Sequence, residues 1–187
     1  MKRIFALLMI IMSISTTVNA QVKLPLMDKS PMDMSYYPTG YPLLKIQDKI
    51  TEPLAMRVIY SRPQLNGRRA FGELREMGKI WRLGANEASE LEFYKDVKLA
   101  GKKIKKGRYT IYCIPYSDKW TMIINKETDT WGDFKYDQTK DAIRFDVPVS
   151  KVTESTEALT MLFDKILGGA NLLIYWDDVK VAVPILF

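Results

Sequence analysis

The chain has 187 residues, 28 of them lysine or arginine and 22 acidic, so its formal net charge is +6, and it contains no histidine. This length is typical of one domain, and a hydrophobic content of 47% is enough to bury a core. The absence of histidine excludes Ser-His-Asp and Cys-His catalysis and most zinc and copper sites.

Residues 1–20 have the layout of a secretory signal peptide. Lys2 and Arg3 precede an apolar run, and Val18 and Ala20 supply the small residues of a cleavage site. The apolar run is shorter than the ~20 residues that a membrane-spanning helix needs. We therefore expect cleavage after Ala20, a mature protein in the periplasm or outside the cell, and no integral membrane span.

The mature chain is predicted to divide into two parts. Residues 21–42 are expected to form an extended N-terminal segment, which is rich in proline. Residues 43–187 contain no internal repeat and no linker, which indicates a single domain. Cys113 is the only cysteine, so no internal disulfide can form. Its apolar, alternating surroundings indicate a buried side chain and not a reactive thiol.

Alternation of apolar and polar residues is the dominant pattern after residue 42, and it is typical of half-buried β-strands. The alternating runs lie at 56–61, 91–94, 109–113, 120–124, 143–147 and 179–183. Clusters of glycine, proline and aspartate separate them, so about eight or nine short strands connected by hairpins are predicted. The fold class is therefore all-β, a single antiparallel β-sandwich or jelly-roll-like domain. Short helical turns are expected only at 68–77 and 138–142.

Short motifs rich in arginine, glycine and aromatic residues follow the first alternating run. They are Tyr-Ser-Arg-Pro at 60–63, Phe-Gly at 71–72, Trp-Arg-Leu-Gly-Ala-Asn-Glu at 81–87, Trp-Gly at 131–132 and Trp-Asp at 176–177. Together they resemble the bacterial domain-of-unknown-function 2911 family over residues 30–187. Leu83 stands where a small polar residue is expected, which removes one hydrogen-bonding group from the candidate site. The resemblance implies an exported bacterial β-sandwich domain and brings no particular activity.

The same motifs supply the candidate ligand-binding residues, which are Arg62, Arg68, Trp81, Arg82 and Asn86. Strand ends and the turn permitted by Gly84 are expected to bring these side chains to one rim of the sandwich. A guanidinium group suits a carboxylate, sulfate or phosphate, and an indole offers a flat face for a sugar. The predicted partner is an anionic small molecule or a saccharide. Alternatively, Glu87 forms an internal salt bridge with Arg62 or Arg82, and the cluster binds no ligand.

If the chain is an enzyme, Glu87 is the candidate acid or base and Tyr60 the candidate proton donor. A single carboxylate beside a tyrosine and arginines suits proton abstraction better than hydrolysis by paired carboxylates. Three functions are therefore compatible with the sequence. They are a non-catalytic binding module, a histidine-independent lyase or hydrolase acting on acidic saccharides, and a structural envelope protein without a ligand.

Two charged clusters and three tryptophans are expected to be structural. The aspartates at 129, 133, 137 and 141 lack the spacing of a calcium loop, so neither a metal site nor a cofactor is predicted. The basic residues between 98 and 108 are predicted to protect a sheet edge, and nucleic acid is not an expected partner. Trp120, Trp131 and Trp176 are all expected in or beside the core.

Overall fold

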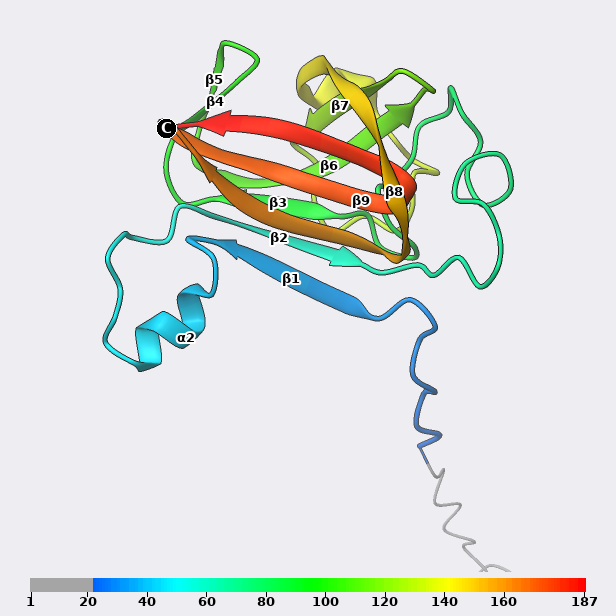
Figure 1. Ribbon diagram of the computed structural model, residues 1–187, viewed down its shortest axis with the longest axis horizontal. Helices are drawn as coiled ribbons and strands as arrows, with labels where there is room; N and C mark the ends of the chain where they lie inside the picture. The colour runs from blue at the N-terminus through cyan, green and yellow to red at the C-terminus, as the bar shows by residue number, and fades with distance from the viewer. Residues whose placement is uncertain (1–21) are drawn as a thin grey trace, which may run out of the picture.

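The computed structural model describes residues 22–187, so the expected signal peptide and its cleavage site lie outside the described residues. The described chain is mostly antiparallel β-sheet (Figure 1). Its strands are β1 (Met32–Tyr37), β2 (Met56–Ser61), β3 (Glu90–Phe93), β4 (Val97–Leu99), β5 (Lys102–Ile104), β6 (Gly107–Pro115), β7 (Lys119–Asn125), β8 (Asp141–Ile166) and β9 (Gly169–Leu186). The sheet order is β1-β2-β3-β6-β7-β8-β9-β4-β5. The predicted all-β, sandwich-like fold is confirmed.

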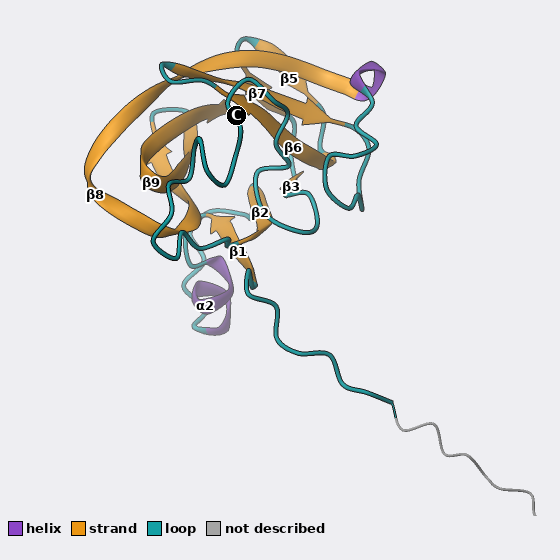
Figure 2. Cartoon of the chain, turned by 90° about the vertical axis from the view of Figure 1, so that its right-hand side faces the viewer, coloured by secondary structure: helices purple, strands orange, loops and turns teal. Residues whose placement is uncertain are grey.

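Strand β8 connects the two halves of the sheet. It is 26 residues long, and it pairs with β7 through residues 141–148 and with β9 through residues 149–166. Figure 2 shows β8 curving around one side of the molecule. The expected strand at 143–147 is therefore the first part of a much longer element.

The segment that follows β2 contacts the far half of β8. The amide of Leu65 donates to the carbonyl of Glu157, and the amide of Leu159 donates to the carbonyl of Pro63, both at 3.0 Å. These bonds hold the residues after β2 against a strand that is distant in sequence. The sheet is thereby folded over so that its inner faces enclose the core.

The N-terminal segment is more regular than its prolines suggested. Residues 32–37 form β1, which pairs with β2 and makes one edge of the sheet. The short helix α2 (Tyr41–Ile46) follows, with Pro42 in its first turn, where a missing amide hydrogen is tolerated. At the other edge of the sheet lies β5, whose Lys102 and Lys103 are exposed as expected for a protected edge.

One of the two predicted helical turns is wrong. Residues 68–77 form consecutive turns without a helix, and the amide of Gly72 donates forward along the chain to the carbonyl of Arg75, opposite to the direction of a helical hydrogen bond. Gly72 has a φ of 101°, which a helix cannot contain. The second turn is present as the 3₁₀ helix η1 (Gln138–Lys140), whose first turn is capped by the Asp137 side chain.

The core is organised around three indole rings. Trp81, Trp120 and Trp176 are each about 1% exposed, and Phe71 contacts all three edge to face. The rings of Trp81 and Trp176 are stacked, with centroids 5.3 Å apart. Trp131 is a correction to the sequence prediction, because it is 63% exposed. Its backbone is bridged to Glu87 in an outer loop, which directs the side chain away from the core.

Among the described residues, no helix is long and apolar enough to span a membrane.

Candidate functional site

The Arg62 side chain connects the end of β2 to residues of β1 and β8. Its guanidinium donates to the carbonyl of Leu159 at 3.1 Å and to the Thr160 hydroxyl at 2.9 Å, and it forms an ion pair with Asp33 at 3.1 Å. Within residues 22–187, Asp33 is the carboxylate that Arg62 contacts, and Glu87 forms an ion pair with neither Arg62 nor Arg82. Arg62 therefore has the stapling role that the sequence offered as an alternative, with a different acidic partner.

A second group of basic residues surrounds a cavity of about 240 Å³, here called the arginine cavity. It lies between the loop from Pro63 to Ala85 and Trp176 of β9. Its basic lining residues are Lys29, Arg68, Arg75 and Arg82. No acidic residue of the described chain lines it, so the cavity carries a concentrated positive charge.

The serine at the end of β2 fixes the loop that carries Arg82. The Ser61 hydroxyl donates to the carbonyl of Ala85 and accepts from its amide, each at 2.6 Å. Gly84 makes this approach possible, because a Cβ at this position would lie 2.8 Å from the Ser61 hydroxyl oxygen. The two motifs at 60–63 and 81–87 are thus joined directly through Ser61, although Arg62 does not line the arginine cavity with Arg82.

Two buried donors at the arginine cavity have no hydrogen-bond partner among the described residues. They are Nε of Arg82 and Nε1 of Trp176. Arg82 also has no carboxylate within ion-pair distance in residues 22–187. Leaving a buried donor unsatisfied costs roughly 1–3 kcal/mol, and native proteins contain few such groups.

Arg75 completes the charge cluster. Its guanidinium is 3.4 Å from the Asp133 carboxylate and lies 5.7 Å from the centre of the Trp81 ring. Burial is the main effect that lowers the pKa of Arg75, and the positive charge of Arg82 lowers it further. The sequence offered no signal for Arg75, because its segment was interpreted as a helical turn.

Comparison with known proteins identifies the family. The chain matches the family described as protein of unknown function (DUF2911) over residues 42–185. It belongs to this family. The resemblance drawn from the motifs is thus confirmed, and the match includes Arg68, Arg75, Arg82 and Trp176. No curated protein and no solved structure matches the chain.

Two further candidate ligand residues lie in the DUF2911 region in different settings. Arg68 is exposed at the mouth of the arginine cavity, where its Nε donates to the carbonyl of Leu65 at 2.8 Å. Trp81 is buried, and its indole N–H donates to the carbonyl of Gly84 at 3.0 Å. Trp81 thus supports the cavity from within the core and offers no free face to a sugar.

Asn86 does not line the arginine cavity. Its backbone has a φ of 60°, and its carbonyl accepts a hydrogen bond from the amide of Gly132 at 2.9 Å. The asparagine is one of the residue types that adopt this left-handed conformation most readily. Asn86 therefore shapes the loop that leads to Glu87 and anchors the segment at 130–132.

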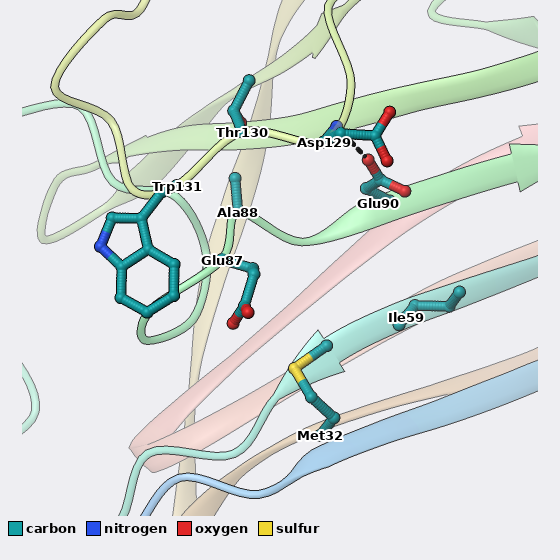
Figure 3. Close-up of a pocket in the computed structure, with 8 residues that line it drawn as sticks. All are labelled: Met32, Ile59, Glu87, Ala88, Glu90, Asp129, Thr130 and Trp131. Carbon is teal, nitrogen blue, oxygen red and sulfur yellow. Dashed lines mark hydrogen bonds between the residues drawn. The ribbon is translucent and has the colours of Figure 1, made fainter. Parts of the chain in front are cut away.

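The structure does not bring Tyr60 and Glu87 together. Tyr60 is buried, donates to the carbonyl of Met161 at 3.2 Å, and has a pKa raised mainly by burial. Glu87 is exposed and shares a cavity with Ile59 on the outer face of the sheet (Figure 3). Because successive residues of a strand point to opposite faces, the side chain of Tyr60 points away from that cavity.

Within the described residues, no group of acidic or cysteine side chains is arranged to hold a metal ion. The four aspartates that the sequence singled out each serve a different local contact. Asp129 pairs with Arg108, Asp133 with Arg75 and Asp141 with Arg144, while Asp137 caps η1.

Proposed function

We propose that this DUF2911 chain is a binding protein whose arginine cavity holds a small anion. The observation that carries the proposal is a cavity with four basic and no acidic lining residues, in which Arg82 has no ion-pair partner among the described residues. Positively charged donors suit a ligand rich in acceptor oxygens. Phosphate, sulfate and carboxylates have this property.

The size of the cavity restricts the ligand. A volume of about 240 Å³ is below the usual ~300–1,000 Å³ of pockets for drug-sized molecules. The ligand class is therefore an inorganic oxyanion or a small organic acid with one or two anionic groups. Gln64, Asn66 and Ser30 also line the cavity and supply neutral hydrogen-bonding groups around such a ligand.

Thermal unfolding of the mature chain, residues 21–187, tests this proposal directly. Phosphate, sulfate, a uronate and a dicarboxylate are compared with chloride at equal ionic strength. A ligand present at 100 times its Kd stabilises the protein by about 2.7 kcal/mol, which raises the Tm of a domain of this size by about 5–10 °C. We expect this saturable rise with at least one of the four anions.

The variant Arg82→Met removes the central donor, and Arg108→Met is the matched control, since Arg108 is an exposed arginine outside the arginine cavity. The anion-dependent rise in Tm should disappear in the first variant and persist in the second. A rise of equal size in both variants, or no rise above that of chloride in the unaltered protein, would refute the proposal.

We further propose that the anion is bound outside the cytoplasm, as the signal-like N-terminus predicts. The mass of the protein recovered from the periplasm or medium of an expressing bacterium tests this. It should correspond to a chain that begins at Gln21, and an intact Met1 in the cytoplasm would contradict it.

A further inference from the structure

A second candidate site surrounds Trp131. The residues that line it differ from those of the arginine cavity. Trp131 is 63% exposed and Phe134 is 80% exposed, whereas the other three tryptophans are buried. Trp131 belongs to a short segment, residues 129–131, here called the Trp131 ridge. The ridge separates two cavities and lines both of them.

The first of these cavities has a volume of about 310 Å³. Figure 3 shows the Glu87 carboxylate lying between the Trp131 indole and the Met32 side chain. Ile59 and Ala88 form its apolar floor. One face of this cavity is therefore apolar, and its rim carries a carboxylate that has no ion-pair partner in residues 22–187.

The second cavity has a volume of about 450 Å³ and is lined by aromatic rings. Tyr112, Phe134 and Tyr136 contribute to it together with Trp131, and Lys135 lies at its rim. The Tyr112 and Tyr136 rings meet edge to face at 5.2 Å. Trp131 thus stands between one cavity with a free carboxylate and another with a lysine.

The backbone around the Trp131 ridge is held on both sides. The amide of Ala88 donates to the carbonyl of Thr130 at 3.0 Å, and the amide of Asp129 donates to the Glu90 carboxylate at 2.7 Å. The hydroxyls of Tyr112 and Thr130 are 3.1 Å apart. A large exposed indole on an anchored backbone presents its surface to a ligand with little loss of conformational entropy on binding.

Most charges near the ridge are paired locally. Asp129 and Glu90 share the single guanidinium of Arg108, and Glu127 pairs with Lys140. Glu87 and Lys135 remain without ion pairs among the described residues, and their charges are opposite. One negative charge is left over at Arg108, which disfavours an anionic ligand, and the ridge offers hydrogen-bond acceptors and donors beside aromatic faces.

We propose that the Trp131 ridge binds a neutral oligosaccharide. A sugar ring has an apolar C–H face that stacks on an aromatic ring, and its hydroxyls both donate and accept hydrogen bonds. One sugar residue lies in each cavity, and Trp131 contacts the chain between them. Glu87 accepts hydrogen bonds from hydroxyls on one side, and Lys135 donates to hydroxyls on the other.

The test is calorimetric titration of the mature chain with neutral oligosaccharides of two to six residues, made of glucose, xylose, mannose or N-acetylglucosamine. We expect one series to bind, with a gain in affinity from one residue to several because both cavities are then filled. Trp131→Ala should weaken binding about tenfold, and Leu167→Ala is the control, since Leu167 is an exposed apolar residue elsewhere.

Fluorescence gives a readout that does not depend on a variant. Trp131 is the exposed tryptophan, so a bound sugar should shield it from acrylamide quenching while the buried indoles stay unchanged. The Arg82→Met variant should bind the sugar normally, which separates this site from the arginine cavity. Binding of none of these sugars at millimolar concentration, or equal affinity in Trp131→Ala and unaltered protein, would overturn the proposal, as would a preference for charged ligands.

Discussion

Arg75 and Arg82 line the same cavity, and the charge of Arg82 adds to burial in lowering the pKa of the Arg75 guanidinium. Two like charges held close together in a partly buried place destabilise the folded protein. The anion proposed for this cavity would reduce their repulsion. The cost of holding Arg75 and Arg82 together is measurable in anion-free buffer.

Replacing Arg82 by methionine should stabilise the protein in anion-free buffer. The change removes a buried unpartnered donor and the repulsion of Arg75, and it keeps the length of the side chain. We expect a gain of about 1 kcal/mol, or 2–4 °C in Tm. Urea unfolding at low ionic strength measures it.

Arg62→Met is the contrasting variant for that experiment. Arg62 bonds to Asp33, Leu159 and Thr160, so its loss should destabilise the protein by roughly 2 kcal/mol. If Arg82→Met destabilises the protein as much as Arg62→Met, Arg82 is a structural residue and the cavity has no ligand.

The ion pairs of Asp178 should make stability fall in acid. Lys151, at 2.8 Å, is the main cause that holds the pKa of Asp178 below its ordinary value of 3.8, and Arg69 contributes in the same direction. A depressed pKa gives stability that is present above the unfolded value and is lost as pH falls below it. Unfolding free energies measured between pH 7 and pH 2 should therefore decrease below about pH 4.

Asp178→Asn should reduce stability at pH 7 and flatten this acid decline. Asp164→Asn is the control, because Asp164 is exposed and forms no ion pair within the described residues. An acid decline of unchanged steepness in Asp178→Asn would show that other carboxylates cause it.

Cys113 should be inert in the folded protein. It is fully buried in β6, and burial raises the pKa of its thiol well above the ordinary value. Only the thiolate reacts with disulfide reagents. At pH 8 we expect no reaction of the native protein and complete reaction of one thiol after unfolding in guanidinium chloride. Fast labelling of the native protein would mean that β6 opens locally.

Two glycines should respond differently to substitution by alanine. A Cβ on Gly169 would overlap the backbone carbonyl of Ile185, whereas a Cβ on Gly84 would meet the Ser61 hydroxyl, which can move aside only by losing its hydrogen bonds to Ala85. We expect Gly169→Ala to destabilise the protein by about 3 kcal/mol or more and Gly84→Ala by about 1–2 kcal/mol. Chemical denaturation of both variants decides the order, and the reverse order would contradict this account of the packing.

Alternating apolar residues marked several strands in the sequence, including β2 and β6. In β2 this alternation reflects burial, because Val58 is buried between half-buried neighbours, whereas residues 110–113 of β6 are all buried. The short strand β4 was missed although its burial alternates. The length of β8 was not predictable, because two different partners bury its two halves and no continuous alternation results. β1 was missed for a similar reason, since its outer methionines are exposed at the sheet edge.

The candidate sites were predictable only in part. Arg82 stood out because glycine and tryptophan flank it in a distinctive motif. Arg75 could not be identified in the same way. Its position at the cavity depends on the conformation of a loop in which Gly72 has a positive φ. Trp131 was assigned to the core from its size alone, and only the pairing of its backbone with Glu87 shows that the indole faces solvent.

The contact between the segment after β2 and the far half of β8 has a consequence for folding. The hairpins β6-β7, β7-β8 and β8-β9 join neighbours along the chain, whereas Arg62 and Leu159 are 97 positions apart. Contacts between distant positions form late, because closing a long loop costs entropy before any contact compensates it. During refolding, β-sheet circular dichroism should therefore recover before the segment after β2 packs against β8. An interrupted refolding experiment would find a nearly complete sheet in which Arg62 does not yet contact Leu159.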